Sequence, residues 1–409
     1  MNPTVKRPEV LAPAGDLDRL ITAVDFGADA VYIGGKSFGM RASPANFTID
    51  DMQAGVTYAH GRGARVYLTL NTLPRNNEIS QMEGYLRQLR EVEIDALIIT
   101  DLGVLALVKK LLPHIELHIS TQMGVVNYAA ATALYEMGAK RVVLARELSM
   151  EDIAQLRQNT PPDLEIEAFV HGAMCMSFSG RCLLSNYMTG RDANRGECAQ
   201  PCRWKYYLME EKRPGQYLPI YEDESGSYIL NAKDMCMIEH IPRLAQAGVT
   251  SFKIEGRAKS EYYVAVVTNA YRMAVDLYAQ DPQGYETPRW LVEEVQKVSH
   301  RQYTTGFYFG APDQYYENGG YVRAVDIVAV VDRCENGRVH CIQRNKFYSG
   351  NRIEALPPKA KPISLEVGQL FDEENRPIPH TAHAMMPFYF HSALSLPRGT
   401  ILRKEKDIQ

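Results

Sequence analysis

Short β-type runs alternate with helix-length segments along the first two-thirds of the chain. Eight such runs are visible: EVLAPAG, AVYIGG, RVYLTLNTL, ALIITD, ELHISTQ, RVVLARE, EIEAFVHG and SFKIEG. A strand followed by a helix, repeated eight times, predicts a (β/α)8, TIM-like barrel, and residues 1–275 match its usual length of about 250 residues. A doubly wound parallel sheet is the alternative, because the same alternation can also build an open sheet.

The alternation is interrupted once and then stops. Residues from about 173 to 250 separate the seventh and eighth runs, which predicts a cysteine-rich insertion after strand 7. Residues 276–320 contain the helical pattern TPRWLVEEVQKVSH and are predicted to form a helical connector. From residue 321 to 409, β-type runs are joined by Gly, Asn and Pro turns, which predicts a small C-terminal β-barrel domain.

Length and charge narrow the class of protein. A chain of 409 residues exceeds the usual limit of one hydrophobic core, so a large domain with a smaller one is expected. No apolar leader or membrane-length run occurs, which predicts a cytoplasmic protein without membrane association. The formal charge of −4 disfavours a broad nonspecific nucleic-acid surface but permits a local basic patch.

Four of the seven cysteines are crowded into the predicted insertion: Cys175, Cys182, Cys198 and Cys202. Zinc ribbons usually pair their ligands at C-x2–4-C spacings, and only the last two of these cysteines fit. Iron–sulfur clusters accept wider and less regular spacings. The pattern therefore favours a 4Fe-4S cluster, with zinc or no metal as the alternatives. Cys236 is an alternative ligand.

Polar residues stand at the ends of several predicted strands. Because the loops that follow the strands form the active face of a TIM-like barrel, these side chains are expected to line its mouth. The predicted catalytic residues are Glu167, His171, Lys253, Glu255 and Arg257. Arg257 and Arg146 are the predicted binders of an anionic small molecule, since a guanidinium group binds carboxylates bidentately, and Lys253 is an alternative to Arg146. Ordinary ion pairs at the barrel rim are the alternative.

Basic and aromatic residues are interleaved around the cysteines. This combination predicts a surface that holds RNA phosphates and stacks an unpaired base, although solvated surface charge would look the same. The predicted RNA-binding residues are Arg181, Arg191, Arg195, Arg203 and Lys205. Cations of the predicted second domain could extend this surface: Lys359, Lys361, Arg398, Arg403, Lys404 and Lys406.

The segment EAFVHGAMCMSFSGRCLLS, from Glu167 to Ser185, resembles the signature of peptidase family U32. LAPAGD, GADAVYIGG, SFKIEGR and SHRQYTTGFYFG are also similar to that family, so the resemblance covers nearly the whole chain. The chain is most similar to the bacterial branch responsible for prephenate-dependent tRNA hydroxylation. That resemblance implies conversion of the wobble uridine to 5-hydroxyuridine, a requirement for prephenate, and a 4Fe-4S cluster held by the four clustered cysteines. Some relatives take one ligand from a position near Cys236.

Two other classes of function stay open. The family's older name implies a collagenase-like peptidase, yet no H-E-x-x-H zinc motif occurs, and a thiolate that binds a cluster cannot also attack a peptide. A non-catalytic RNA-binding protein would need the mouth residues to be purely structural. The expected partners are tRNA and prephenate, and a paralogous or other partner subunit is compatible with the sequence.

Overall fold

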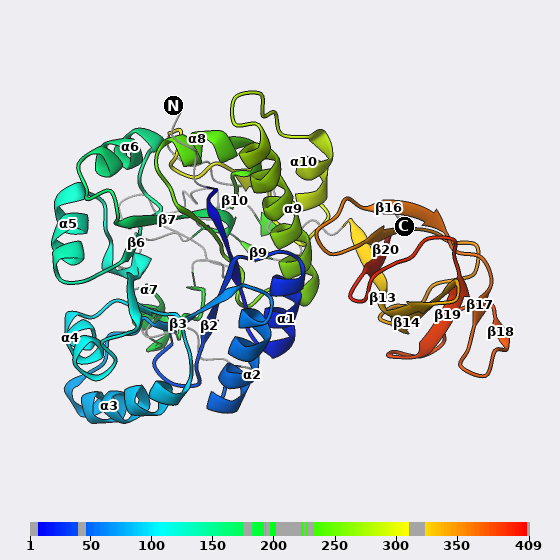
Figure 1. Cartoon of the computed structure of the whole chain (residues 1–409), viewed down its shortest axis with the longest axis horizontal. Coiled ribbons are helices and arrows are strands. Elements are labelled where there is room, and N and C mark those ends of the chain that lie inside the picture. Colours follow the sequence, from blue (N-terminus) through cyan, green and yellow to red (C-terminus); the bar gives the residue numbers. More distant parts are fainter. Residues whose placement is uncertain are drawn as a thin grey trace, which may run out of the picture.

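Eight parallel strands close into a barrel in the N-terminal part of the chain (Figure 1). They are β1 (Glu9–Pro13), β2 (Ala30–Gly34), β3 (Arg65–Leu70), β4 (Ala96–Ile99), β5 (Glu116–Ile119), β6 (Arg141–Val143), β7 (Glu165–Ala173) and β11 (Ser251–Ile254). Each strand pairs with the next, and β11 pairs with both β7 and β1. The closure confirms the predicted (β/α)8 barrel and excludes the open doubly wound sheet.

This computed structural model describes residues 7–39, 46–174, 182, 184–191, 193, 197–201, 222–223, 226–227, 233–310 and 324–406. Among the predicted site residues, Cys175, Cys202, Arg181, Arg195, Arg203 and Lys205 lie outside these ranges.

Helices surround the barrel on its outer side (Figure 1). They are α1 (Leu17–Asp25), α2 (Ile49–His60), α3 (Ile79–Gln88), α4 (Leu102–Leu111), α5 (Tyr128–Glu136), α6 (Met150–Gln158), α8 (Ile241–Gln246) and α9 (Glu261–Gln280). Thr48 and Ser149 begin α2 and α6 with capping boxes, which satisfy backbone N–H groups at the helix start. The long helix α9 continues past residue 275. None of the described helices is long and apolar enough to cross a membrane.

Alternation along each barrel strand separates an apolar outer face from a more polar interior. In β1, Val10 and Ala12 pack in the main core under the helices, whereas Leu11 belongs to a small inner cluster with Tyr32 and Tyr67. Successive side chains of a strand point to opposite faces, so every second residue enters the barrel. The charged residues at positions 9, 141, 165, 167 and 253 all occupy inward positions, as their mutual contacts show.

Several short elements follow β7. They are α7 (Leu184–Thr189), the two-stranded pair β8 (Glu222–Asp223) and β9 (Gly226–Ser227), β10 (Asp234–Cys236) and the 3-10 turn η6 (Ile238–His240). Strand β10 runs antiparallel to β7, with Cys236 opposite His171, and β12 (Tyr303–Thr304) extends the sheet beyond β10. Further 3-10 turns are η1 (Asn76–Glu78), η2 (Leu89–Glu91) and η3 (Thr121–Met123).

The C-terminal part is an antiparallel sheet that forms a half-barrel beside the TIM-like barrel (Figure 1). Its strands are β13 (Val325–Glu335), β14 (Arg338–Gln343), β15 (Arg352–Leu356), β16 (Ile363–Glu366), β17 (Leu370–Phe371), β18 (Pro377–Ile378), β19 (Pro387–His391) and β20 (Ile401–Glu405). Val328, Phe347 and Phe390 pack inside this sheet, so it has a hydrophobic core of its own.

Arg403 joins the C-terminal sheet to the helical connector. Its guanidinium group is fully buried and donates two hydrogen bonds of 2.7 Å to the carboxylate of Glu294 in α10 (Arg289–Val295). Its Nε also donates to Glu354 of β15 at 3.0 Å. The prediction that Arg403 belongs to an RNA-binding surface is therefore wrong. Its guanidinium group is buried between the C-terminal sheet and the helical connector, where it pairs with Glu294 and Glu354.

Candidate active site at the barrel mouth

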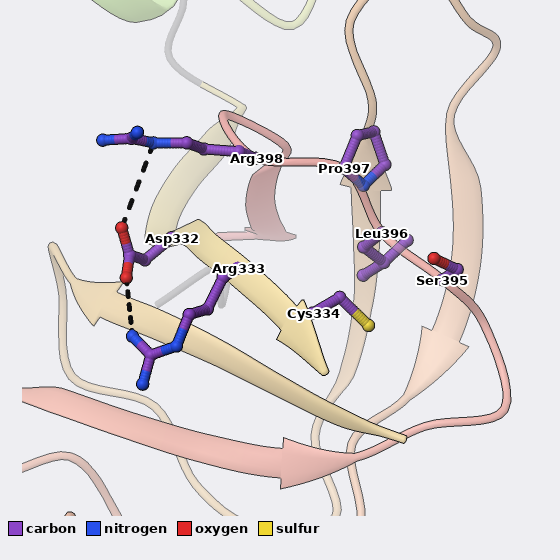
Figure 2. A pocket seen from close by; sticks show the side chains of 7 residues that line it. All are labelled: Asp332, Arg333, Cys334, Ser395, Leu396, Pro397 and Arg398. Carbon is purple, nitrogen blue, oxygen red and sulfur yellow. Dashed lines mark hydrogen bonds and ion pairs between the residues drawn. The ribbon is translucent and has the colours of Figure 1, made fainter. Parts of the chain in front are cut away.

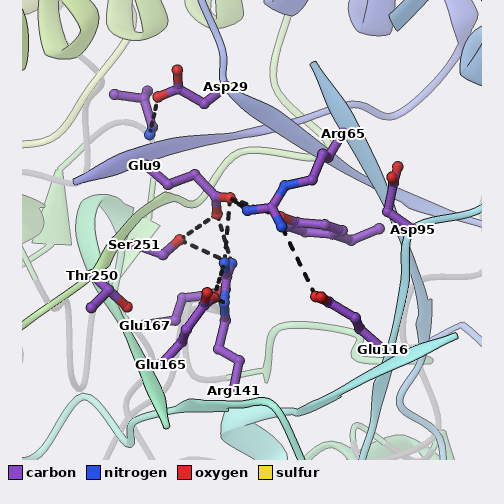
Figure 3. Close-up of polar contacts among 12 residues, drawn as sticks. Glu9, Asp29, Arg65, Asp95, Glu116, Arg141, Glu165, Glu167, Thr250 and Ser251 are labelled. Carbon is purple, nitrogen blue, oxygen red and sulfur yellow. Dashed lines mark hydrogen bonds and ion pairs between the residues drawn. The ribbon is translucent and has the colours of Figure 1, made fainter. Parts of the chain in front are cut away.

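A buried ion network fills the floor of the barrel (Figure 3). Nη1 of Arg141 donates to Glu9 at 2.6 Å and to Glu167 at 3.0 Å, and its Nη2 donates to Glu165 at 2.5 Å. Ser251 donates a further hydrogen bond to Glu9 at 2.8 Å. Arg141 is 1% exposed and Glu167 is fully buried, so these charges are stabilised by one another and not by water.

The cations of this network keep its carboxylates ionised. Burial alone would raise the pKa of Glu9, but Arg141 and Arg65 outweigh that cost and lower the pKa to about 2. Burial also opposes ionisation of Glu167, but the positive charges of Lys253 and Arg141 outweigh this effect. The pKa of Glu167 therefore lies below its ordinary value. Both carboxylates are therefore negative at neutral pH and can hold cations in place.

Lys253 lies above this floor. Its Nζ donates to Glu167 at 2.5 Å and stands 4.6 Å from the centre of the Tyr32 ring. Within the described ranges, Glu167 is the only hydrogen-bond acceptor of this ammonium group, although an ammonium group carries three N–H bonds. The arrangement leaves Lys253 capable of donating to a molecule in the barrel while Glu167 fixes its position.

Three further predicted residues lie at the C-terminal ends of the strands. Arg146, after β6, stacks on the Phe169 ring at 3.9 Å and lies 3.8 Å from the carboxylate of Glu255. Nη1 of Arg257 donates to the hydroxyl of Thr69 at 2.9 Å. These contacts orient two guanidinium groups on the face where TIM-like barrels carry their active sites, a suitable arrangement for binding an anion.

Gly172 allows the end of β11 to approach β7 closely. It has a φ of +108°, and an added Cβ atom there would clash with the backbone oxygen of Glu255. The side chain of Arg257 extends past Gly34, where an added Cβ atom would displace only the Nη1 end of that flexible side chain.

A bulge turns His171 away from the other mouth residues. The pairing of β7 with β11 shifts by one residue between Phe169 and His171, which reverses the alternation of side chains. The imidazole then lies 3.4 Å from the hydroxyl of Tyr271 and 3.3 Å from that of Tyr303. Burial lowers the pKa of His171 to about 3, so the ring is neutral at physiological pH. The structure thus brings Glu167, Lys253, Glu255 and Arg146 together through direct contacts and the shared Phe169 ring. Arg257 lies at the same end of the barrel, on Thr69, whereas His171 is turned away.

Two of the four clustered cysteines fall within the described ranges. Cys182 is half-buried and Cys198 is exposed, and neither forms a disulfide. Cysteine sulfurs are the donor type that an iron–sulfur cluster takes, so the chemistry of these two side chains fits such a cluster. The described residues alone contain no group of three metal-ligating side chains. Arg191, the described member of the predicted RNA-binding set, is exposed.

Sequence reasoning missed three neighbours of the mouth residues, namely Tyr32, Thr69 and Phe169. They contact Lys253, Arg257 and Arg146, respectively. It also missed the role of Arg141. A charged residue at the start of the short apolar run RVVLARE, together with Glu9 and Glu165 at matching positions, was the available signal for an inward-facing ion network.

A pocket of about 490 Å³ lies beside the mouth, where β2 and β3 end. Its lining includes Ser37, in the sequence G-K-S-F-G that matches the G-x-S-x-G pattern of serine hydrolases. A nucleophile elbow needs a sharp strand-to-helix turn at the serine. Here Phe38, not Ser37, has the positive φ of 58°, and α2 begins only at Ile49. The match is therefore not a nucleophile elbow.

A second pocket, of about 440 Å³, lies in the C-terminal sheet (Figure 2). Two arginines border it, and both face the same carboxylate: Asp332 lies 2.8 Å from Arg333 and 4.0 Å from Arg398. The exposed Arg398 was part of the predicted RNA surface. Asp332 offsets part of its charge, so this pocket is less basic than its two arginines alone would indicate.

Comparisons with known proteins match both parts of the chain. The model for peptidase family U32 matches residues 15–318, and the model for the peptidase family U32 C-terminal domain matches residues 323–403. The chain is 36% identical to the tRNA hydroxylation protein P1 of Bacillus subtilis (strain 168), over 98% of this chain and 96% of that protein.

Two other relatives carry different names. The tRNA hydroxylation protein P of Escherichia coli (strain K12) is 36% identical, over 86% of this chain and 87% of that protein. A protein named collagenase, from Porphyromonas gingivalis (strain ATCC BAA-308 / W83), is 35% identical over 74% of this chain and 73% of its own length. Family models covering nearly the whole chain, together with these identities, show that the chain belongs to peptidase family U32.

Proposed function

We propose that this protein hydroxylates tRNA in the cytoplasm, converting the wobble uridine to 5-hydroxyuridine in a reaction that requires prephenate. The likeness to a tRNA hydroxylation protein over 98% of this chain carries the proposal. The mouth residues support it, because two oriented guanidinium groups above a buried lysine suit a small dicarboxylate beside a reacting base.

The roles of the residues follow from their contacts. Arg257, oriented by Thr69, and Arg146, oriented by Glu255 and the Phe169 ring, would bind the carboxylates of prephenate. Lys253, held by Glu167, would donate a hydrogen bond to an oxygen that gains negative charge during the reaction. These groups are already positioned, so little reorganisation is needed when the substrates bind.

The cluster site is the second part of the proposal. Cys175, Cys182, Cys198 and Cys202 would hold a 4Fe-4S cluster, with Cys236 as the alternative to Cys202. Such a cluster supplies one-electron redox chemistry. All four clustered cysteines come after β7 in the sequence, and the loops that follow the strands of a TIM-like barrel form its active face, which supports the proposal.

Iron analysis tests the ligand set. After anaerobic purification we expect about four iron and four sulfide per chain, a loss of both in Cys175→Ala, and full retention in Cys236→Ala. Iron and sulfide quantification with visible absorption and EPR spectra measures this. Loss in Cys236→Ala together with retention in Cys202→Ala would move the fourth ligand to Cys236, and zinc or no metal in the wild type would refute the cluster.

Nucleoside analysis tests the activity. Expression in a bacterial strain that lacks tRNA hydroxylation should restore 5-hydroxyuridine, measured by mass spectrometry of digested tRNA. The same strain with its prephenate synthesis blocked should show none until prephenate is supplied. Restoration without prephenate would contradict the prephenate requirement, and no restoration in any bacterial host would contradict the activity. A purified chain that works only with added lysate would indicate a partner subunit.

A thiol peptidase is disfavoured by the described residues. Such an enzyme needs a thiolate beside a protonated imidazole, which requires a lowered cysteine pKa and a histidine that can accept a proton. Cys236 lies opposite His171, but burial raises the pKa of its thiol to about 12 and lowers that of His171 to about 3. Both groups are therefore neutral, the opposite of an activated pair.

A further inference from the structure

The pocket of about 490 Å³ beside the mouth is built from three segments. They are the loop after β2, the loop after β3 with η1, and one face of α3. Residues of all three segments line it, among them Lys36, Phe38, Gly39, Glu78, Gly84 and Tyr85. Since β2 and β3 both end here, the pocket lies on the active face of the barrel.

The pocket adjoins the group that orients Arg257. A Cβ atom added to Gly39, in the pocket wall, would lie 3.8 Å from the hydroxyl of Thr69. That hydroxyl accepts the 2.9 Å hydrogen bond from Arg257. A molecule in the pocket and an anion bound to Arg257 would therefore be neighbours. The Gly39 backbone and the Thr69 side chain would lie between them.

The lining matches an uncharged, planar and hydrogen-bonding ligand. The side chains of Ser37, Gln81 and Gln88 make no hydrogen bond within the described part of the chain, so their donors and acceptors are available. The rings of Phe38 and Tyr85, 6.0 Å apart and tilted by 45°, supply an apolar aromatic wall. Aromatic rings that stack a base and amides that read its edge are how proteins hold an unpaired nucleobase.

The charges of the pocket disfavour a dicarboxylate. Among the described residues that line the pocket, Lys36 is the single cation, and the carboxylate-bearing Glu78 is also part of the lining. A dicarboxylate is bound better by guanidinium groups, and those lie outside this pocket at Arg146 and Arg257. The two neighbouring sites therefore have different chemistry, one for an anion and one for a neutral polar ring.

We propose that this pocket receives the target uracil base of the RNA, flipped out of its stack, while the anionic cosubstrate occupies the arginines beside it. This assignment rests on the proposed tRNA hydroxylation. An enzyme that modifies a base must bring it out of the stack and into a pocket, and binding selectivity then comes from stacking and from hydrogen bonds to the base edge.

Gly84 permits a direct test of the pocket. It lines the pocket from α3, and no atom lies within 4 Å of a Cβ added there. The change Gly84→Leu should thus fill the pocket without a clash, and a leucine favours the helix more than a glycine does. Ser80→Leu is the matched control, because Ser80 is exposed on the same helix and does not line the pocket.

Binding would be measured by fluorescence anisotropy with two fluorescein-labelled anticodon stem-loop RNAs. One carries uridine at the wobble position and the other an abasic site there. We expect the wild type and Ser80→Leu to bind the uridine RNA about 10-fold more tightly than the abasic RNA. Gly84→Leu should bind both equally, with an unchanged urea unfolding midpoint or a higher one.

Three results would overturn the assignment. The first is that Gly84→Leu keeps the full preference for the uridine RNA over the abasic RNA. The second is that the wild type shows no such preference. The third is that Gly84→Leu keeps the preference but needs more prephenate for activity. The last result would make the pocket a carboxylate site. A wild type that prefers the uridine RNA but forms no 5-hydroxyuridine would instead refute the proposed hydroxylation and leave the base pocket standing.

Discussion

Replacing Arg141 with methionine is expected to reduce the free energy of unfolding by about 3–5 kcal/mol, measured by urea denaturation at neutral pH. The change leaves the carboxylates of Glu9 and Glu167 without the guanidinium group that lies 2.6 Å and 3.0 Å from them. Water cannot replace it, because Glu167 is fully buried and Arg141 is 1% exposed. Methionine fills much of the same volume as arginine. The loss of unfolding free energy therefore measures the removal of the charge rather than the creation of a cavity.

Arg65→Met is the matched control for this prediction. Arg65 also forms an ion pair with Glu9, but its side chain is 40% exposed and the change should cost less than about 1 kcal/mol. Equal losses in the two variants would contradict a special role for the buried guanidinium group.

The Arg141 effect should also depend on pH. The pKa of Glu9 is lowered from 4.5 to about 2, so its contribution is complete above pH 4.5 and disappears as pH falls toward 2. The stability difference between Arg141→Met and the wild type should shrink over that range. A difference that stays constant down to the lower limit would indicate that packing, not charge, carries the effect.

The barrel was predictable because its signal is periodic and repeated. Each strand carries an apolar outer face that a helix covers, and all eight predicted runs contain a strand of the closed barrel. Local signals also worked where the physics is local. Ser149 followed by Asp152 at the third helical position is the sequence pattern of a capping box, and α6 begins with one.

The orientation of His171 could not be predicted by the same alternation. An inward position for Glu167 and Phe169 implies an inward position for His171 two residues later. The bulge adds one residue on β7 and reverses the alternation. No feature of EIEAFVHG announces it, since the bulge arises from the pairing with β11 and from the antiparallel contact with β10.

The burial of Arg403 is a second property that depends on tertiary contacts. The sequence ILRKEK looks like a basic surface strand, and its neighbours Lys404 and Lys406 are at least partly exposed. Arg403 points instead at Glu294 in the connector, 109 positions earlier in the chain. Which member of a basic run is buried depends on where the partner carboxylate lies, and a single sequence contains no information on that pairing.

Lys253→Met is expected to lower the rate of tRNA hydroxylation by at least about 100-fold while the protein stays folded. The fold should persist because Glu167 keeps its 3.0 Å ion pair with Arg141. The apparent KM for prephenate should change little, since the carboxylates are assigned to Arg257 and Arg146, so the loss should appear in kcat. Initial rates of 5-hydroxyuridine formation at varied prephenate concentration measure both quantities.

Lys259→Met serves as the control for the loss of a lysine near the mouth. Lys259 follows β11 as well, but its Nζ donates to the backbone oxygen of Ser299 at 3.2 Å and lies outside the barrel interior. Its activity should stay close to that of the wild type. A Lys253→Met enzyme with wild-type kcat and a raised KM would contradict the role given to Lys253, because the ammonium group would then bind the cosubstrate rather than stabilise charge that develops during the reaction.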